Sequence, residues 1–245
     1  MSHWQRGKVN AHGYVSSLPS LMDFPMMYAM RTALTDQGAG FNEVYETLSL
    51  DYLYPEPGNL VLFEGNHDIS RLFSVVGEDV GLYKMAIAYT MTMPRIPQFY
   101  YGTEILMTSA TKGRDDASYR HDFPGGWIGD KVNAFTGAGL TPQQRDAQAF
   151  VSKLVNWRKS QPVIHHGKMM QFGPEHDTYV YYRYNDTKRI MVAFNKNAKP
   201  ASLPTARFQE MLKGARSGVD ALTGKTYDLS DALTLPARSV LVLEI

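Results

Sequence analysis

The spacing of hydrophobic residues changes near Gln161, and this change constrains the fold more than any other feature of the sequence. Before it, short apolar runs alternate with stretches of helical spacing, which is the pattern of βα units. After it, Tyr179–Tyr184 and Arg189–Phe194 are two strand-like runs separated by a short polar turn, which predicts a β-hairpin. We therefore expect an α/β domain over residues 1–161 and a small antiparallel all-β domain over residues 162–245.

Capping and breaking residues predict individual elements. Thr141-Pro142-Gln143-Gln144 combines an N-cap threonine, a proline at the first helical position and a glutamine that can close a capping box, so a helix should begin there. Asn42 is placed to cap a shorter helix that ends near Leu50. The other expected elements are helices over residues 25–34 and 80–93, strands over residues 60–63, 96–101 and 239–245, and a long loop over about residues 106–140.

The composition narrows the classes of function. Lys and Arg total 25 against 24 Asp and Glu, and the net charge of +1 gives no reason to expect nucleic acid or an acidic membrane as a partner. The absence of cysteine excludes disulfides, thiolate metal sites and a cysteine nucleophile. No apolar run reaches the roughly 18 residues of a membrane span. The opening residues have no apolar signal core, but this does not fix the compartment.

The strongest candidate for a chemical site is Asn66-His67-Asp68, which follows the apolar run of residues 60–63 directly. In a βα barrel, catalytic groups project from the C-terminal ends of strands. A carboxylate and an imidazole there can hydrogen-bond sugar hydroxyls, and Asp68 could stabilise an oxocarbenium-like transition state. Two alternatives remain open. Asn66 or Asp68 could cap the following helix, or His67 and Asp68 could bind a metal, although no third ligand accompanies them and we expect none.

Several motifs resemble the α-amylase family of glycoside hydrolases. Phe63-Glu64-Gly65-Asn66-His67-Asp68 resembles the family's fourth signature region, whose core is Asn-His-Asp after a barrel strand. Residues 94–105 resemble its eighth strand, with Arg95 where glycine is usual. Residues 120–127 and the opening Trp4-Gln5-Arg6-Gly7-Lys8 resemble the neopullulanase and cyclomaltodextrinase branch.

The resemblance implies a fold and a set of site residues. The family has a TIM (β/α)8 barrel followed by a β-sandwich, so the chain would hold a partial barrel, strands six to eight, and then the small antiparallel sandwich. By resemblance, His67 contacts the sugar at subsite −1, with Asn66 beside it, and Asp68 is the family's third carboxylate, which distorts and holds that sugar. Asp116 and Arg120 match a pair that binds the substrate's non-reducing side. Asp115 is an equal candidate for the place of Asp116, and an ordinary surface ion pair is the alternative for Asp116 and Arg120.

The resemblance also implies what the chain lacks. The family's nucleophile lies in a Gly-x-Arg-x-Asp motif, which does not occur before His67, and its acid/base glutamate would fall before the chain begins. A retaining glycosidase needs two carboxylates about 5 Å apart, so the chain is expected to be inactive alone. We expect a fragment of an enzyme acting on α-1,4-glucans such as maltodextrin, cyclodextrin or pullulan. A non-catalytic carbohydrate-binding protein and one half of a split enzyme are the alternatives.

The resemblance extends to partners and location. The complete enzyme would add the missing N-terminal half of the barrel, form a homodimer in some relatives, and require no cofactor, although some relatives hold calcium. A bacterial periplasmic or extracellular location follows from the resemblance alone. Trp127, in the Gly-rich loop, could stack on sugar or wedge the loop onto the barrel.

Overall fold

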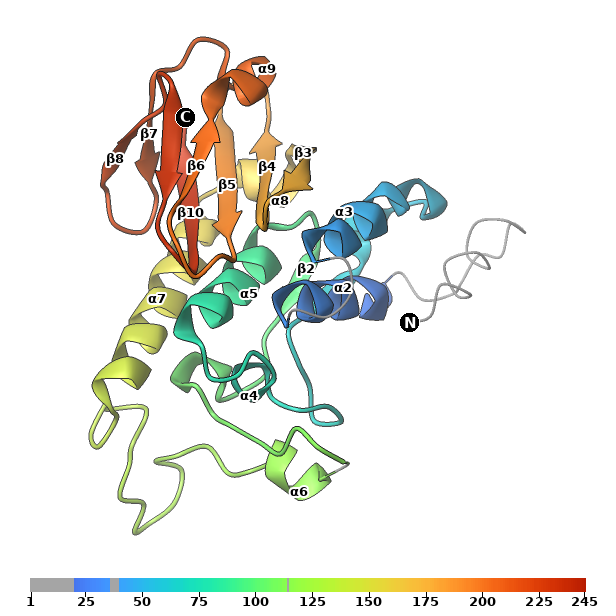
Figure 1. Cartoon of the computed structure of the whole chain (residues 1–245). Coiled ribbons are helices and arrows are strands. Elements are labelled where there is room, and N and C mark those ends of the chain that lie inside the picture. The colour runs from blue at the N-terminus through green and yellow to red at the C-terminus, as the bar shows by residue number, and fades with distance from the viewer. Residues whose placement is uncertain (1–19, 36–39, 114) are drawn as a thin grey trace.

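A computed structural model describes residues 20–35, 40–113 and 115–245 (Figure 1). The opening motif Trp4–Lys8 lies outside these residues. The helices are α2 (Phe24–Leu34), α3 (Phe41–Ser49), α4 (Leu72–Val75), α5 (Val80–Thr92), α6 (Asp116–Tyr119), α7 (Pro142–Lys159), α8 (Pro162–His166) and α9 (Gln209–Leu212). The strands are β1 (Val61–Phe63), β2 (Ile96–Gln98), β3 (Lys168–Glu175), β4 (Thr178–Tyr184), β5 (Arg189–Asn195), β6 (Ala201–Pro204), β7 (Ser217–Asp220), β8 (Thr226–Asp228), β9 (Ala232–Leu235) and β10 (Ser239–Glu244).

The N-terminal part is built around short parallel strands. β1 pairs with β2 in parallel, with Val61 opposite Ile96, and Met22 forms a parallel bridge to Val61 on the other side of β1. The carboxyl ends of β1 and β2 therefore meet at one edge. β2 ends at Gln98, three residues before the predicted end at Tyr101, because the chain turns away there to begin a loop. The assignment of these strands to a (β/α)8 barrel stays a prediction.

Helices cover these strands and carry most of the N-terminal core. Asp23 caps α2 by accepting a hydrogen bond from the Met26 N–H at 3.1 Å, and Pro25 lies in the first turn as predicted. α5 is buried on nearly every side because it packs against α2, α7 and β10 at once. The hydroxyls of its two buried threonines, Thr90 and Thr92, donate hydrogen bonds to backbone carbonyls one turn earlier, so both hydroxyls are paired.

The C-terminal part is a six-stranded antiparallel sheet, in the order β3-β4-β5-β10-β7-β8, with a second pair of strands, β6 and β9, beside it (Figure 1). The predicted hairpin is confirmed: β4 and β5 pair in register, and the Asn185 side chain accepts hydrogen bonds within the turn. Side chains alternate between two cores. One face of the sheet packs on α5 and α7, and the other on β6, β9 and α9.

Arg183 joins the sheet to the helical part. Its buried guanidinium donates to the carbonyl of Thr92, at the end of α5, at 2.8 Å, and to the carbonyl of Gly167 at 2.8 Å. Beside it, the hydroxyls of Thr92 and Tyr181 are hydrogen-bonded at 2.5 Å. A cation on the last carbonyls of a helix satisfies acceptors that have no partner within the helix.

Several local predictions fail for identifiable reasons. Asn42 does not cap a helix, because α3 already begins at Phe41 and Gly40, with φ of 60°, is the N-cap. The segment predicted as one long loop contains the single-turn helix α6. The capping box at Thr141 is confirmed, with both reciprocal hydrogen bonds present. The chain is thus a mixed α/β protein with a large antiparallel sheet. None of the described helices is long and apolar enough to cross a membrane.

Candidate functional site

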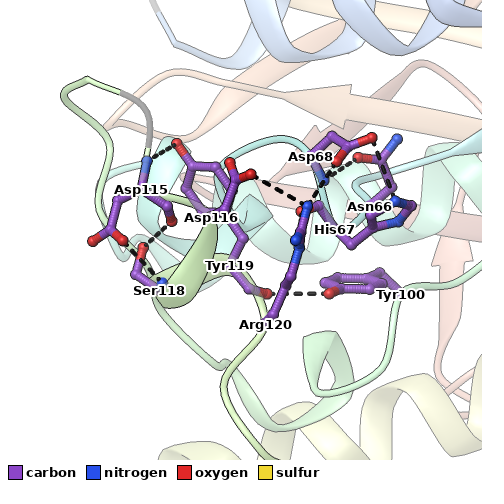
Figure 2. Close-up of polar contacts among 9 residues, drawn as sticks. All are labelled: Asn66, His67, Asp68, Tyr100, Asp115, Asp116, Ser118, Tyr119 and Arg120. Atoms are coloured by element: carbon purple, nitrogen blue, oxygen red, sulfur yellow. Dashed lines mark hydrogen bonds and ion pairs between the residues drawn. The ribbon is translucent and has the colours of Figure 1, made fainter.

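Asn66, His67 and Asp68 follow β1 closely in the chain, at the edge where the parallel strands end. Figure 2 shows their side chains. The Asn66 Oδ1 accepts a hydrogen bond from the Asp68 N–H at 2.9 Å, which folds the triplet into an Asx turn. The alternative that Asn66 or Asp68 caps the following helix is wrong. α4 begins at Leu72, and its N-cap is Arg71, which makes no capping hydrogen bond with its side chain.

Arg120 crosses from the distant loop to this turn (Figure 2). Its Nε donates to the carbonyl of His67 at 3.0 Å, and its Nη2 donates to Asp68 Oδ1 at 3.0 Å and to Asp116 Oδ2 at 3.4 Å. The imidazole of His67 lies beside the same carboxylate, with Nε2 3.4 Å from Asp68 Oδ2. The arginine therefore joins the two predicted parts of the site, which are separated by 52 residues in sequence.

The polar atoms of this cluster face solvent. The side chains of His67, Asp68 and Arg120 are 63%, 54% and 44% exposed. Exposed ion pairs contribute little to stability, typically below 1 kcal/mol, so the cluster is not a significant stabiliser of the fold. The exposed Asp68 carboxylate, His67 imidazole and Arg120 guanidinium are groups that can hydrogen-bond a hydroxyl-rich ligand.

The structure distinguishes the roles of the two adjacent aspartates. Asp115 is the N-cap of α6, and its Oδ1 accepts a hydrogen bond from the Ser118 N–H at 3.2 Å (Figure 2). Asp116, in the first turn of α6, is the aspartate that meets Arg120. The spacing alone could not separate them, because both lie close enough in sequence to Arg120.

Four residues that the sequence did not single out hold the backbone segments that carry the cluster. Arg31, on α2, donates to the carbonyls of Glu64 at 2.8 Å and Ser70 at 2.9 Å, so it fastens both ends of the turn that carries Asp68. The other three are Glu64, Arg71 and Tyr100, which link the segments after β1 and β2. For Glu64, the signal was a charged residue directly after an apolar strand, since such residues are rarely buried without a partner.

Glu64 is fully buried directly after β1. Its Oε1 accepts the Tyr100 N–H at 3.0 Å, which connects the two strand ends. Burial raises the pKa of Glu64 to about 7, partly opposed by the Thr103 hydroxyl, the Tyr100 N–H and the charges of Arg31 and Arg71. The carboxyl therefore titrates near neutral pH, although it has no access to solvent.

The remaining candidates are placed as follows. Trp127 is 68% exposed among the described residues, and the two roles considered for its ring, stacking on sugar or holding the loop on the barrel, stay predictions. The backbone N–H groups of Trp127 and Gly125 both donate to Asp130 Oδ2, and these hydrogen bonds hold the backbone that carries the Trp127 ring. Among the residues that the structure describes, no group of three or more His, Asp or Glu side chains could hold a metal ion.

A groove of about 680 Å³ lies beside the strand ends, between the segment after β2 and α7. Tyr100, Tyr101, Glu104 and His165 are among its lining residues, whereas His67 and Asp68 are not. The cluster is therefore on an open surface next to this groove and does not line it.

Comparison with known proteins agrees with the sequence motifs. Residues 169–244 match the family model of the cyclo-malto-dextrinase C-terminal domain. The cyclomaltodextrin glucanotransferase of Paenibacillus macerans is 28% identical over 214 residues, which are 84% of this chain and 27% of that protein. The α-amylase of Niallia circulans is 28% identical over 218 residues, which are 84% of this chain and 37% of that protein.

Solved structures show the same fold. The α-amylase of Geobacillus thermoleovorans, complexed with acarbose, superposes with a TM-score of 0.75 at 21% identity, covering 98% of this chain and 50% of that one. An Anoxybacillus α-amylase gives a TM-score of 0.77 at 18% identity, covering 100% and 50%. The chain thus spans about half of these structures, and the predicted resemblance to the C-terminal half of α-amylase family enzymes is confirmed.

Proposed function

We propose that the chain is the C-terminal part of a retaining glycoside hydrolase that acts on α-1,4-glucans. In this proposal residues 1–161 supply the last three strands of a (β/α)8 barrel, and residues 162–245 form the β-sandwich that follows it. The observation that carries the proposal is the exposed cluster of His67, Asp68 and Arg120 at the shared ends of two parallel strands. Names of relatives support the substrate class, since solved neighbours were crystallised with acarbose and maltose.

The cluster has the chemistry to hold a sugar ring. The imidazole of His67 and the amide of Asn66 can donate hydrogen bonds to hydroxyls, and the carboxylate of Asp68 accepts them. Asp68 is also placed to stabilise a positively charged, oxocarbenium-like transition state, since charge–charge attraction strengthens as the ring becomes cationic. Arg120 orients this carboxylate through a hydrogen bond and also contacts Asp116. In the proposal, its N–H groups can donate to sugar hydroxyls as well.

Bond cleavage requires groups beyond this cluster. Double displacement uses one carboxylate as nucleophile and a second as acid/base, about 5 Å apart across the scissile bond. Asp68 cannot serve as both, and the sequence before His67 contains no Gly-x-Arg-x-Asp motif. We therefore infer that the chain binds α-glucans and depends on a further barrel segment for hydrolysis. That segment would be encoded in the same gene or on a separate chain.

Calorimetric titration of the 245-residue chain with maltoheptaose tests the proposal. Wild type should bind, and Asp68→Asn should weaken binding at least tenfold, because the hydrogen-bonded anion is lost. Asp146→Asn is the matched control. Asp146 lies on α7, outside the cluster, and forms an ion pair at the surface with Lys84 of α5. No binding by wild type, or equal loss in both variants, would refute a sugar site at Asp68.

A non-catalytic carbohydrate-binding protein is the second candidate, since the exposed side chains of His67, Asp68 and Arg120 could hold a sugar without cleaving it. The coding DNA upstream of Met1 separates the two. An open frame that encodes Gly-x-Arg-x-Asp supports the enzyme, whereas a stop codon followed by a ribosome-binding site supports the binding protein or the split enzyme.

A further inference from the structure

The backbone of Arg120 is held on both sides by two consecutive tyrosines. The Tyr100 hydroxyl donates to the carbonyl of Tyr119 at 3.1 Å (Figure 2), and the Tyr101 hydroxyl donates to the carbonyl of His121 at 2.8 Å. The segment after β2 is thus hydrogen-bonded to the carbonyls of the residues before and after Arg120. This segment lies beside the turn after β1, which carries Asp68.

The tyrosines themselves rest on a buried cation. The guanidinium of Arg71 lies 4.8 Å from the centroid of each ring, and its Nη1 donates to the carbonyl of Tyr101 at 2.7 Å. Arg71 is 2% exposed, and within the described part of the chain its Nε and Nη2 have no hydrogen-bond partner. The electron-rich ring faces stabilise this charge together with the nearby carboxyl groups of Glu64 and Glu104.

The contacts close a ring around the site. Glu64 accepts the Tyr100 N–H, the Tyr100 hydroxyl holds Tyr119, and the next residue, Arg120, returns to Asp68, four residues after Glu64. Each contact in this ring is between 3.0 and 3.1 Å. A closed ring of hydrogen bonds restricts the position of an exposed side chain more than a single contact does.

We propose that Tyr100 and Tyr101 are positioning residues that hold Arg120 against Asp68 through their hydroxyl groups, with buried Arg71 as their support. This inference rests on the proposed sugar site for its importance in function, but its geometry can be tested without any sugar. Accurate placement matters in such a site because displacement by about 1 Å can cost a hundredfold in rate.

The two hydroxyls hold the backbone on either side of the same residue, Arg120, so the effects of removing them should be strongly non-additive. Tyr100→Phe and Tyr101→Phe each leave one of the two carbonyls hydrogen-bonded. Each should raise the exchange rate of the Arg120 Nε–H about two- to threefold. The double variant keeps both rings over Arg71 but releases both carbonyls. The exchange rate should rise at least tenfold in the double variant, which is more than the product of the two single effects.

Hydrogen exchange of the Arg120 Nε–H, followed by ¹⁵N NMR on the full chain, is the direct readout, because this proton is hydrogen-bonded to the His67 carbonyl. The double variant should speed exchange at least tenfold, while the amide protons of the six-stranded sheet keep their protection. Tyr227→Phe, on β8 of that sheet, is the matched control and should leave exchange unchanged. Unchanged Arg120 exchange in the double variant would overturn the proposal.

Two further outcomes are distinguishable. Should the double variant not fold, the single variants decide: each must speed Arg120 exchange two- to threefold, and no change in either overturns the proposal. Maltoheptaose titration of the same variants then separates this inference from the function. If Arg120 exchange responds as expected but wild type binds no maltoheptaose, the positioning role stands and the proposed sugar site fails.

Discussion

The titration of Glu64 predicts how the stability of the chain depends on pH. Glu64 is fully buried, and burial raises its pKa from the ordinary value of 4.5 to about 7. Between these values the unfolded chain has released this proton, while the folded chain still holds it. Raising the pH therefore favours unfolding: this contribution to stability is complete below pH 4.5, falls as the pH rises, and is lost above about pH 7.

The size of the effect follows from the two pKa values. One pKa unit corresponds to about 1.4 kcal/mol, so the difference between 4.5 and 7 amounts to about 3 kcal/mol of unfolding free energy. Domains of this kind have total stabilities of about 5–15 kcal/mol, so the loss should be easy to measure. The charges of Arg31 and Arg71 oppose this shift, and their attraction is already included in the raised pKa of Glu64.

Glu64→Gln isolates this contribution from the other titrating groups. The variant keeps an acceptor for the Tyr100 N–H but has no proton to release. We would measure urea unfolding by circular dichroism at half-unit steps from pH 5 to 8.5. The unfolding free energy of Glu64→Gln minus that of wild type should rise by about 2.5 kcal/mol between the two ends of this range. Glu175→Gln, at an exposed ion pair with Arg207, serves as the control and should give a difference of less than about 0.5 kcal/mol throughout. A constant difference between Glu64→Gln and wild type would refute the reasoning.

Two remaining predictions concern the core and the chemistry. Arg95→Gly restores the residue that is usual in the resembled motif, but it should lower the unfolding free energy by about 3–5 kcal/mol in urea titration. The reason is that Arg95 binds Asp23 at 2.9 Å with both side chains fully buried; a loss below 1 kcal/mol would contradict this. Incubation of the purified chain with maltoheptaose or cyclodextrin should release no reducing sugar, because Asp68 cannot act as both nucleophile and acid/base. Turnover that disappears in Asp68→Ala would contradict the proposed division of the enzyme.

The sequence predicted the elements whose signals are local. The capping box at Thr141, the proline in the first turn of α2 and the hairpin of β4 and β5 each depend on neighbours a few residues away, and each was found. Asn42 failed as a cap because the glycine two residues earlier allows the backbone to turn at positive φ. The helix α6 was missed because a single turn is too short to show a hydrophobic period.

The candidate site was only partly predictable. The polar triplet and Arg120 came from motifs, but which aspartate faces Arg120 depends on the cap of α6, and this was visible only in three dimensions. Arg31, Glu64 and Arg71 escaped notice because charged residues in a sequence are usually assigned to the surface. Arg95 illustrates the same limit: as a sequence feature it is a departure from the resembled pattern, whereas in the structure it neutralises Asp23 and also binds Asp51.

The central claim is that a sugar ring sits on Asn66, His67, Asp68 and Arg120, and mapping the binding of maltoheptaose by NMR tests it most directly. On titration of the ¹⁵N-labelled chain, the account predicts that the largest shift changes fall on the backbone of residues 66–68 and on the Arg120 Nε–H. They should be absent in Asp68→Asn at the same ligand concentration. Shift changes confined to the six-stranded sheet, or none at saturating maltoheptaose, would contradict it.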